Sequence, residues 1–311
     1  MGAARLRARL PLARAGHPRA IPGHGFLVTR GGAFARLERS GARHRVAAAA
    51  RRPPAPVRQG RRRAAARRGG DLSLRVLLTG AGGQLGRALR VKAPAAAVPR
   101  ALGHAELDIA DADALERAFR EFAPEAVINA AAFTRVDAAE EAPEAAARAN
   151  AQGPERLASA CARHGAWLTH VSTDYVFDGR QGHPYGRDAQ PNPLSVYGRT
   201  KLEGERAVLR VLPGASTVVR ASWLYSAAGG FLGRMLALMR SRAELSVVSD
   251  QVSSPTAASG LAAVLWALSS RRVPGLWHWC DSGCASWYDF AVAIAEEAVR
   301  QGLLPGAPRI L

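Results

Sequence analysis

Residues 75–86 read Arg-Val-Leu-Leu-Thr-Gly-Ala-Gly-Gly-Gln-Leu-Gly, so an apolar run turns directly into a glycine-rich loop. An unbroken apolar run is typical of a strand buried on both faces of a parallel sheet. The glycines at 80, 83 and 86 depart from the usual G-x-G-x-x-G fingerprint, whose third glycine is replaced by Leu85. The loop still offers backbone N–H groups and a helix N-terminus to a pyrophosphate. We therefore expect Gly80, Gly83, Gln84, Leu85 and Gly86 to bind a cofactor; the alternative is a tight turn without ligand.

From residue 73 onward, short β-rich runs alternate with helical stretches. The expected strands are Arg75–Thr79, Ala126–Ala130, Trp167–Ser172 and Thr217–Ala221, with a further one near Ala97–Leu102. The expected helices are Asp111–Phe122, Pro143–His164, Ser195–Val211, Phe231–Met239, Ala257–Leu268 and Trp287–Val299. This alternation predicts an α/β fold, a Rossmann-type doubly wound parallel sheet covered by helices. We expect the nucleotide-binding part mainly in residues 73–222 and a smaller C-terminal substrate-binding lobe mainly in residues 223–311.

The first 72 residues differ sharply in composition from the rest. Residues 1–70 hold 18 arginines, no lysine and one acid, a charge of +17; the remainder, with 25 basic and 24 acidic residues, carries +1. The stretch is rich in Ala, Gly and Pro and has little apolar periodicity, which predicts a disordered extension. Three interpretations stay open: sequence translated from a misplaced start, which we favour, an organelle-targeting peptide, or a polycation that binds nucleic acid. We expect no nucleic-acid partner for the near-neutral remainder.

The sequence gives no sign of a membrane segment, because no apolar run approaches the ~20 residues that a membrane helix needs. Three cysteines, Cys161, Cys280 and Cys284, fit neither a zinc spacing nor an even disulfide framework. They are expected to be small buried hydrophobic residues, and a reducing cytoplasm is the predicted location.

Tyr197 and Lys201 lie four residues apart on an expected helix, downstream of the run Ser172-Thr173-Asp174-Tyr175. Positions i and i+4 share a helix face, so the Lys201 ammonium can lie beneath the Tyr197 phenol and lower its pKa by roughly 1–3 units. A phenol tuned in this way is a general acid for carbonyl chemistry. The alternative for an isolated pair is an exposed aromatic residue beside an exposed lysine.

The expected second strand ends without the acidic residue that often binds an adenosine ribose about 20 positions after the glycine loop. Arg100 and His104 stand there instead. Because a 2′-phosphate is attracted by arginine and repelled by a carboxylate, this favours NADPH, with NADH as the alternative. Asp108 is expected either to meet the adenine amino group of the cofactor or to cap the helix that begins near Asp111.

Finer motifs narrow the class of enzyme. The segments that carry a resemblance are Asn129-Ala-Ala-Ala-Phe-Thr-Arg-Val-Asp137, Ser172-Thr-Asp-Tyr-Val-Phe-Asp-Gly179, Val196-Tyr-Gly-Arg-Thr-Lys201, Arg220-Ala-Ser-Trp-Leu-Tyr225 and Asp250-Gln-Val-Ser-Ser-Pro-Thr256. In order and spacing they resemble the dTDP-4-dehydrorhamnose reductase family of the extended short-chain dehydrogenase/reductases, from about Leu74 to the end of the chain. The resemblance implies reduction of the C4 ketone of dTDP-4-dehydro-L-rhamnose to dTDP-L-rhamnose by hydride transfer from NADPH or NADH. It also allows a homodimer.

The same resemblance implies a role for each catalytic residue. Tyr197 is the general acid that protonates the forming alkoxide, and Lys201 lowers the phenol pKa and holds the nicotinamide ribose. Thr173 hydrogen-bonds the ketone oxygen of the substrate.

Further residues are assigned to binding by the resemblance. Ala130 and Ala131 line the cofactor cleft through their backbones, and Asn150 resembles the helix asparagine that supports the catalytic lysine in related reductases. Asp174 belongs to the substrate site, with a structural hydrogen bond as the alternative. Trp223 forms an apolar wall against the deoxy sugar or, equally, part of the core between the two lobes.

The sequence departs from the family pattern in places. Ser253 stands where many members have glycine, which costs stability if the turn needs a positive φ. Ala88 replaces a glutamate that some members use in a magnesium-linked dimer, so we predict no metal. Arg220 follows a buried strand and is expected to be a structural ion-pair partner or a substrate contact. The chain also ends before the length typical of the family, which we interpret as a truncation.

Two rival functions remain from the sequence. A sugar-nucleotide epimerase or dehydratase of the same superfamily also uses a Tyr/Lys pair, but a dehydratase needs added carboxylates, and only Asp174 stands beside Thr173. A non-catalytic cofactor-binding protein, such as the regulatory subunit of methionine adenosyltransferase, resembles the same family. The presence of Thr173, Tyr197 and Lys201 together favours catalysis.

Overall fold

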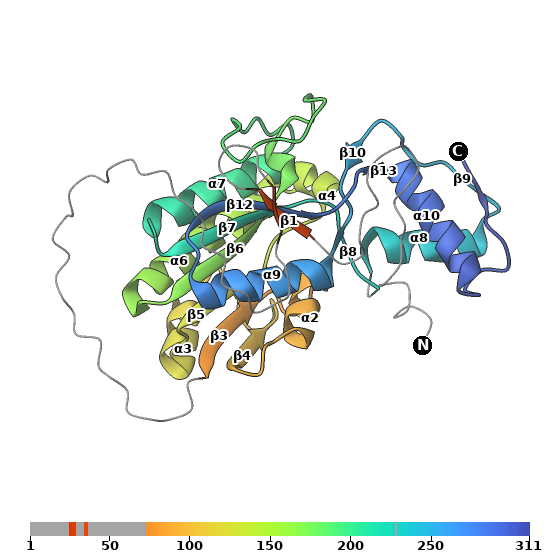
Figure 1. Cartoon of the computed structure of the whole chain (residues 1–311). Coiled ribbons are helices and arrows are strands. Elements are labelled where there is room, and N and C mark those ends of the chain that lie inside the picture. The colour runs from red at the N-terminus through yellow and green to blue at the C-terminus, as the bar shows by residue number, and fades with distance from the viewer. Residues whose placement is uncertain (1–24, 29–33, 37–72, 228) are drawn as a thin grey trace.

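The structure is a computed structural model that describes residues 25–28, 34–36, 73–227 and 229–311. Its centre is an eight-stranded sheet with the order β2-β1-β12-β7-β6-β5-β3-β4 (Figure 1). The strands are β1 (Gly25–Val28), β2 (Phe34–Arg36), β3 (Leu74–Thr79), β4 (Ala97–Leu102), β5 (Ala126–Asn129), β6 (Trp167–Thr173), β7 (Ser216–Ala221) and β12 (Gly275–Asp281). The six strands from β12 to β4 are parallel, and β1 and β2 add an antiparallel pair at one edge.

The sheet has a point where the direction of winding reverses. The first parallel strand along the chain is β3. The chain then crosses to β4 on one side of β3 and returns past β3 to β5 on its other side. Ligands of open α/β sheets bind at the carboxyl ends of the strands at such a point, because the loops there diverge and leave a crevice. The glycine loop follows β3 directly, so it lies at this position.

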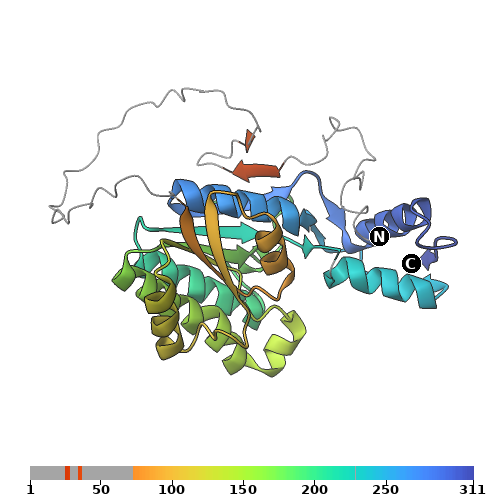
Figure 2. The same ribbon diagram turned by 90° about the horizontal axis from the view of Figure 1, so that it is seen from below.

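Two helix layers cover the sheet, and the alternation of side chains along β3 shows why. Val76 and Leu78 face a core with α2 and α9, whereas Leu77 between them faces a core with α3 and α6. Figure 2 shows the sheet between these layers. The helices of the sheet domain are α2 (Gln84–Val91), α3 (Ala112–Phe122), α4 (Val136–Glu141), α5 (Pro143–Ala147), α6 (Gly153–His164), α7 (Val196–Val211) and α9 (Ala258–Arg271). The predicted Rossmann-type fold is confirmed.

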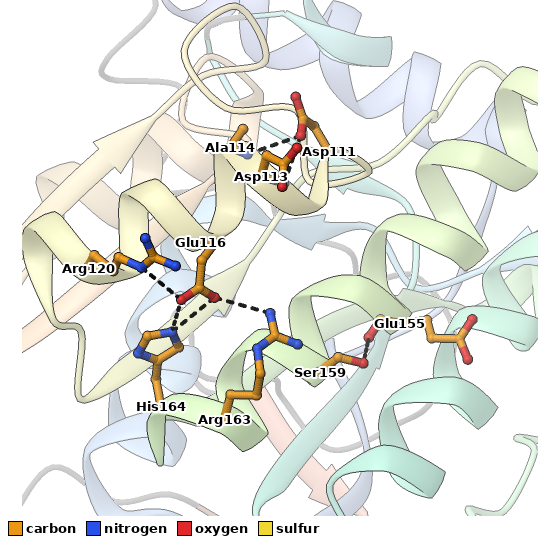
Figure 3. Close-up of polar contacts among 9 residues, drawn as sticks. All are labelled: Asp111, Asp113, Ala114, Glu116, Arg120, Glu155, Ser159, Arg163 and His164. Carbon is orange, nitrogen blue, oxygen red and sulfur yellow. Dashed lines mark hydrogen bonds and ion pairs between the residues drawn. The ribbon is translucent and has the colours of Figure 1, made fainter.

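Polar contacts at the outer surface join α3 to α6 (Figure 3). Asp111 is the N-cap of α3, where its carboxylate accepts two backbone N–H groups of the first turn at 2.9 and 3.0 Å. Glu116, one turn further on, accepts hydrogen bonds from Arg120 of its own helix and from Arg163 and His164 at the end of α6. These exposed pairs fix the orientation of the two helices more than they stabilise the fold.

The expected single helix 143–164 is interrupted by a π-helical turn, η1 (Arg148–Gln152), between α5 and α6. Pro154 has no N–H to donate to the carbonyl of Asn150 four residues earlier, so the regular pattern cannot continue there. Gly204 of α7 packs against that carbonyl so closely that a Cβ would lie 2.1 Å from the Asn150 oxygen. The interruption therefore lets α7 approach η1.

The C-terminal lobe is a separate cluster beyond the carboxyl ends of the strands (Figure 2). Its core lies between α8 and α10 and includes Leu232, Met235, Phe290 and Ile294. Three short strand pairs, β8 with β11, β10 with β13 and β9 with β14, complete it. The elements are β8 (Leu224–Tyr225), α8 (Gly230–Ser241), β9 (Glu244–Leu245), β10 (Val252–Ser253), β11 (Thr256–Ala257), β13 (Ala285–Ser286), α10 (Trp287–Arg300) and β14 (Arg309–Ile310).

The chain returns once from the predicted C-terminal part, mainly 223–311, to the sheet of the predicted nucleotide-binding part, mainly 73–222. The segment 258–281 returns from the lobe to form α9, which packs on α2, and β12, which pairs with β7. β12 was not expected as a strand, because its sequence Gly-Leu-Trp-His-Trp-Cys-Asp mixes polar and bulky residues. It is nevertheless held by parallel pairing to β7 over five residue pairs.

Other expectations meet the structure only in part. Residues 25–28 and 34–36 of the N-terminal extension form β1 and β2, and the rest of residues 1–72, with the predicted disorder and its three interpretations, lies outside the described residues. Cys161 is buried as expected, but Cys280 is only half-buried and Cys284 is exposed. In the part of the chain that the structure describes, no helix is long and apolar enough to cross a membrane.

Candidate active site

The glycine loop has its shape because two of its glycines admit no side chain. Gly80 has φ +68°, and a Cβ there would lie 2.5 Å from the backbone nitrogen of Ala131. A Cβ on Gly86 would lie 2.2 Å from the carbonyl oxygen of Gly80, so α2 begins hard against β3. Gly83 is the exposed N-cap of α2, and a Cβ on the equally exposed Gly82 would meet no atom within 4 Å. The loop thus packs against protein at Gly80 and Gly86 and is exposed to solvent at Gly82 and Gly83.

Two further predicted loop residues have structural contacts of their own. The side chain of Leu85 is buried in the core with α9, so only its backbone can contribute to a ligand site. Gln84 accepts a hydrogen bond of 2.9 Å from the Ser226 hydroxyl of the lobe. Gln84 therefore ties the start of α2 to the C-terminal lobe.

Asn129, at the end of β5, organises the backbone beside the glycine loop. Its Oδ1 accepts from the Thr79 hydroxyl at 2.6 Å and from the Ala131 N–H at 3.0 Å, while its Nδ2 lies 3.0 Å from Nδ1 of His170. The backbone N–H of Ala131 can only donate, so Oδ1 is the acceptor and Nδ2 donates to His170. The network fixes Ala130 and Ala131 against Gly80, which supports their predicted place at the cleft.

His170 is a buried histidine that the sequence reasoning missed. Because its Nδ1 accepts from Asn129, its proton is on Nε2. Burial, followed by the nearby charge of Lys201, lowers its pKa well below the usual value. Nε2 has no hydrogen-bond partner among the described residues, and the lowered pKa keeps the ring neutral near Lys201.

Asp108 is engaged in its own loop. Its Oδ1 accepts the Ala110 N–H at 2.8 Å, and its other oxygen pairs with Arg148. Burial raises its pKa, but these hydrogen bonds and the charge of Arg148 together leave it below the usual value. The cap of α3 is Asp111, so the capping alternative for Asp108 is wrong; its proposed contact with adenine stays a prediction.

The argument for NADPH from free cations after the second strand is weakened by the structure. Arg100 forms an ion pair of 2.9 Å with Glu121, which occupies its guanidinium. Glu106 lies in the following loop and accepts the Gly103 N–H at 2.8 Å. This exposed acid was overlooked because it lies beyond the end of the strand.

Tyr197 is brought to Thr173 by the close packing of the first turn of α7. Ser195 caps that turn by accepting the Gly198 N–H at 3.1 Å. A Cβ on Gly198 would lie 2.2 Å from the carbonyl oxygen of Tyr175, so the helix touches the backbone that follows β6. The rings of Tyr197 and Tyr175 meet edge to face at 5.6 Å, and the Thr173 hydroxyl acts to lower the pKa of the Tyr197 phenol.

The expected effect of Lys201 on Tyr197 is wrong for this structure. Burial, aided by the charge of Asp174, raises the phenol pKa to about 12, against the hydrogen bond to Thr173. Among the described residues, Lys201 is not one of the groups that shift it. The buried ammonium instead donates to the carbonyl of Val171 at 2.7 Å, and burial lowers its pKa to about 8. Lys201 and Tyr197 share a helix face, but the long Lys201 side chain reaches a carbonyl on β6 instead of the phenol.

Arg220 and Glu205 form a buried ion pair next to this lysine. Nε and Nη2 of Arg220 donate to the two carboxylate oxygens at 2.9 and 2.7 Å, and the side chains are only 5% and 2% exposed. Arg220 also lies over the ring of Phe177. It is therefore a structural ion-pair partner, as one of the two expectations held. The charge of Glu205 acts to raise the pKa of Lys201 against burial.

Asp174 binds protein groups with both carboxylate oxygens. Oδ1 accepts from the Thr173 hydroxyl at 3.2 Å, and Oδ2 accepts from the Ser253 hydroxyl of β10 at 3.1 Å. Burial raises its pKa to about 6 despite these bonds. Ser253 does not have a positive φ, so the loss of stability expected for a serine in place of glycine does not arise. Its hydroxyl instead gains a hydrogen bond to Asp174.

Trp223 lies where the chain leaves β7 for the lobe. Its φ of +37° is unusual for a bulky residue and marks local strain. Its ring stacks on that of Trp287 with centroids 3.5 Å apart and planes 8° apart. This contact supports the inter-lobe core; the wall against the sugar stays a prediction.

Asn150 supports α7 in a different way from the one expected. Its Oδ1 accepts the Phe133 N–H at 2.8 Å, and its Nδ2 donates to the Phe133 carbonyl and to the Thr200 hydroxyl. It thus holds the residue before Lys201 rather than the lysine itself.

The α/β sheet has a glycine loop at its switch point and Thr173 at the carboxyl end of β6, with Tyr197 and Lys201 on the helix α7 beside it. This arrangement defines a short-chain dehydrogenase/reductase, here with an added lobe. Residues 74–307 match the family model described as the RmlD substrate binding domain. The chain belongs to the dTDP-4-dehydrorhamnose reductase family of oxidoreductases, as its motifs predicted.

Individual relatives agree with this assignment. A dTDP-4-dehydrorhamnose reductase of Aggregatibacter actinomycetemcomitans is 40% identical over 245 residues, which are 76% of this chain and 83% of that protein. The crystal structure of a dTDP-4-dehydrorhamnose reductase from Clostridium acetobutylicum has a TM-score of 0.71 and 38% identity, covering 76% of this chain and 83% of that one. The enzyme of the same name from Bacillus anthracis, solved in complex with NADP, has a TM-score of 0.73 and 34% identity, covering 77% and 84%.

Proposed function

We propose that this chain reduces the C4 ketone of dTDP-4-dehydro-L-rhamnose to give dTDP-L-rhamnose, with NADPH as hydride donor. The observation that carries the proposal is the placement of Tyr197 beside the end of β6: the first turn of α7 packs against the Tyr175 backbone, and the Thr173 hydroxyl acts on the phenol pKa. Membership of the reductase family supplies the substrate class.

The glycine loop fits a dinucleotide. Gly80 and Gly86 cannot carry side chains without striking backbone, whereas Gly82 and Gly83 are exposed at the N-terminus of α2. That end of the helix offers unpaired N–H groups to a pyrophosphate. The bound cofactor would supply the hydride. NADPH is supported by the NADP complex of the Bacillus anthracis enzyme, and NADH stays the alternative.

The proton would come from Tyr197. With its pKa raised to about 12, the phenol is protonated at neutral pH, as a proton donor must be. Lys201 uses one of its three N–H donors on the Val171 carbonyl, which leaves two for the nicotinamide ribose. Thr173 would complete the site by contacting the ketone oxygen, and Trp223 would face the deoxy sugar.

Two coarser features belong to the proposal. We place the enzyme in the cytoplasm, because its three cysteines are free and one of them is exposed. We also propose a homodimer, for which the resemblance to the family is the only support.

The test is consumption of NADPH by the full chain with dTDP-4-dehydro-L-rhamnose, compared with UDP-linked 4-keto sugars and with no sugar. We expect turnover only with the dTDP sugar. Tyr197→Phe should lower kcat by at least ~10²-fold, since a general acid typically contributes 10²–10⁴, and leave the Kd for NADPH unchanged. Undiminished turnover by the variant would refute the role of the phenol, and a preference for a UDP sugar would refute the substrate.

A further inference from the structure

Ser253 and Asp174 connect the lobe to the proposed catalytic threonine through a continuous chain of hydrogen bonds. Ser253 lies on β10, which pairs with β13 inside the C-terminal lobe, and its hydroxyl donates to Oδ2 of Asp174 at 3.1 Å. Oδ1 of the same carboxylate accepts the Thr173 hydroxyl at 3.2 Å. Asp174 is thus held between the two parts of the molecule.

The proton of Thr173 can be in only one place at a time. A hydroxyl has a single O–H donor, and in this structure it points to Asp174. The Thr173 oxygen also accepts the Tyr175 N–H at 3.2 Å. While the hydroxyl points there, it cannot also donate to the Tyr197 oxygen, although such a donation is what would lower the pKa of the phenol.

We infer that Ser253 is a positioning residue for the proposed reaction: its hydroxyl holds the Asp174 carboxylate, and ionised Asp174 holds the proton of Thr173 away from Tyr197. The inference rests on the proposed function and deepens its proton step. When Tyr197 gives up its proton to the substrate oxygen, the phenolate formed needs a hydrogen-bond donor. Thr173 can be that donor only when Asp174 no longer takes its proton.

Asp174 opposes proton release in a second way. Its negative charge raises the pKa of Tyr197, so a protonated Asp174 removes both the charge and the competition for the Thr173 hydroxyl. The balanced step is transfer of the Tyr197 proton to the alkoxide formed by hydride addition, with the Thr173 proton turning from Asp174 to the phenolate. Proton transfer should therefore be faster when Asp174 is protonated.

Asp174 differs from the titratable side chains that it affects, because it alone among them has a pKa near 6, whereas the pKa of Lys201 on α7 is about 8. The titratable side chains that it affects are Tyr175 on its own segment, Tyr197 on α7 and Cys280 on β12, and the pKa of each is raised, so all three stay protonated. Burial raises the pKa of Asp174 to about 6, and the Ser253 hydroxyl opposes that rise. Ser253 therefore sets the pH at which Asp174 takes up its proton.

The experiment measures the single-turnover rate of NADPH oxidation against pH for wild type, Ser253→Ala, Ser253→Thr and Ser254→Ala. Wild type should slow as pH rises through a break near 6. Loss of one hydrogen bond to a charged group should move the break upward by about one pH unit in Ser253→Ala. Ser253→Thr keeps the hydroxyl and should keep the wild-type break. Ser254→Ala, whose native hydroxyl donates to the Gly283 carbonyl, is the matched control and should keep it as well.

A second measurement separates this inference from the proposed function. The carboxyl carbon of Asp174, assigned by its absence in Asp174→Asn, is titrated by NMR in wild type and Ser253→Ala without substrate. An upward shift of about one unit in the variant supports the hold of Ser253 on Asp174 even if no sugar is turned over. An equal pKa in both proteins, an equal shift in Ser254→Ala, or a rate that increases with pH through the break would overturn the inference.

Discussion

Gly198 offers a stringent test of how the site is built, because the glycine itself has no side chain to take part in chemistry. It lies between Tyr197 and Arg199 in the first turn of α7, and a Cβ there would be 2.2 Å from the carbonyl oxygen of Tyr175 and 3.0 Å from Cβ of Pro193. A carbon and a carbonyl oxygen normally approach no closer than about 3.3 Å. In Gly198→Ala the helix or the segment after β6 must therefore move by about 1 Å.

Two opposing effects decide the outcome. Alanine favours a helix over glycine by up to ~1 kcal/mol, which would stabilise the variant. Overlap with backbone atoms costs about 1–3 kcal/mol, and neither the Tyr175 carbonyl nor a proline ring can turn aside. The overlap wins, so we expect a lower Tm. A displacement of about 1 Å at a catalytic group can cost ~10²-fold in rate, and kcat/KM should fall by that order because Tyr197 moves with the turn.

The assay is NADPH oxidation with dTDP-4-dehydro-L-rhamnose, together with a thermal melt. Gly233→Ala is the matched control, because Gly233 also lies within a helix but a Cβ there meets no atom within 4 Å. We expect the control to retain wild-type kcat/KM and an equal or higher Tm. If Gly198→Ala keeps kcat/KM within threefold of wild type, close packing of α7 on Tyr175 is not what positions the phenol.

Two further changes probe the buried charges. Glu205→Gln leaves Arg220 buried without its counter-ion, so the free energy of unfolding should fall by about 3–5 kcal/mol in urea melts. Glu203→Gln, on the exposed face of the same helix, should change it by less than ~0.5 kcal/mol, and equal losses would contradict the reasoning. Asp174 has its pKa raised from 3.8 to about 6, so the folded state binds the proton more tightly than the unfolded state. Between pH 4 and 6, wild type should therefore lose up to about 3 kcal/mol relative to Asp174→Asn as pH rises, and a constant difference across that range would show that Asp174 is not perturbed.

Much of the sheet could be predicted because its strands carry their own signal. Val76, Leu77 and Leu78 form an unbroken apolar run, since β3 is covered on both faces, and a glycine-rich loop follows the strand directly. β12 lacked that signal: its burial comes from pairing with β7 and from α9, which no local pattern reveals. The interruption of the helix before α6 goes with the packing of Gly204 of α7 against the Asn150 carbonyl, a contact between two helices that no local pattern reveals.

Spacing and resemblance proposed the members of the site, Tyr197, Lys201 and Thr173, and the structure places Tyr197 beside Thr173. The contacts of these residues could not be predicted in the same way. The partner of Lys201 is a backbone carbonyl on β6, which spacing along α7 cannot specify. Ser253 reaches Asp174 across 79 residues of sequence, and a lone serine in a loop gives no sign of such a partner.

The path of the chain through the lobe has a mechanical consequence. The backbone leaves the sheet after β7, comes back as α9 and β12, and leaves again toward β13. The lobe is thus connected to the sheet domain by three chain segments rather than by a single linker. Any closing motion over a bound nucleotide sugar must bend all three together, which disfavours a wide swing and favours a small sliding adjustment. The lobe therefore cannot be removed as one continuous piece of sequence: cutting the chain before Trp223 would also remove α9 and the strand β12 from the other half.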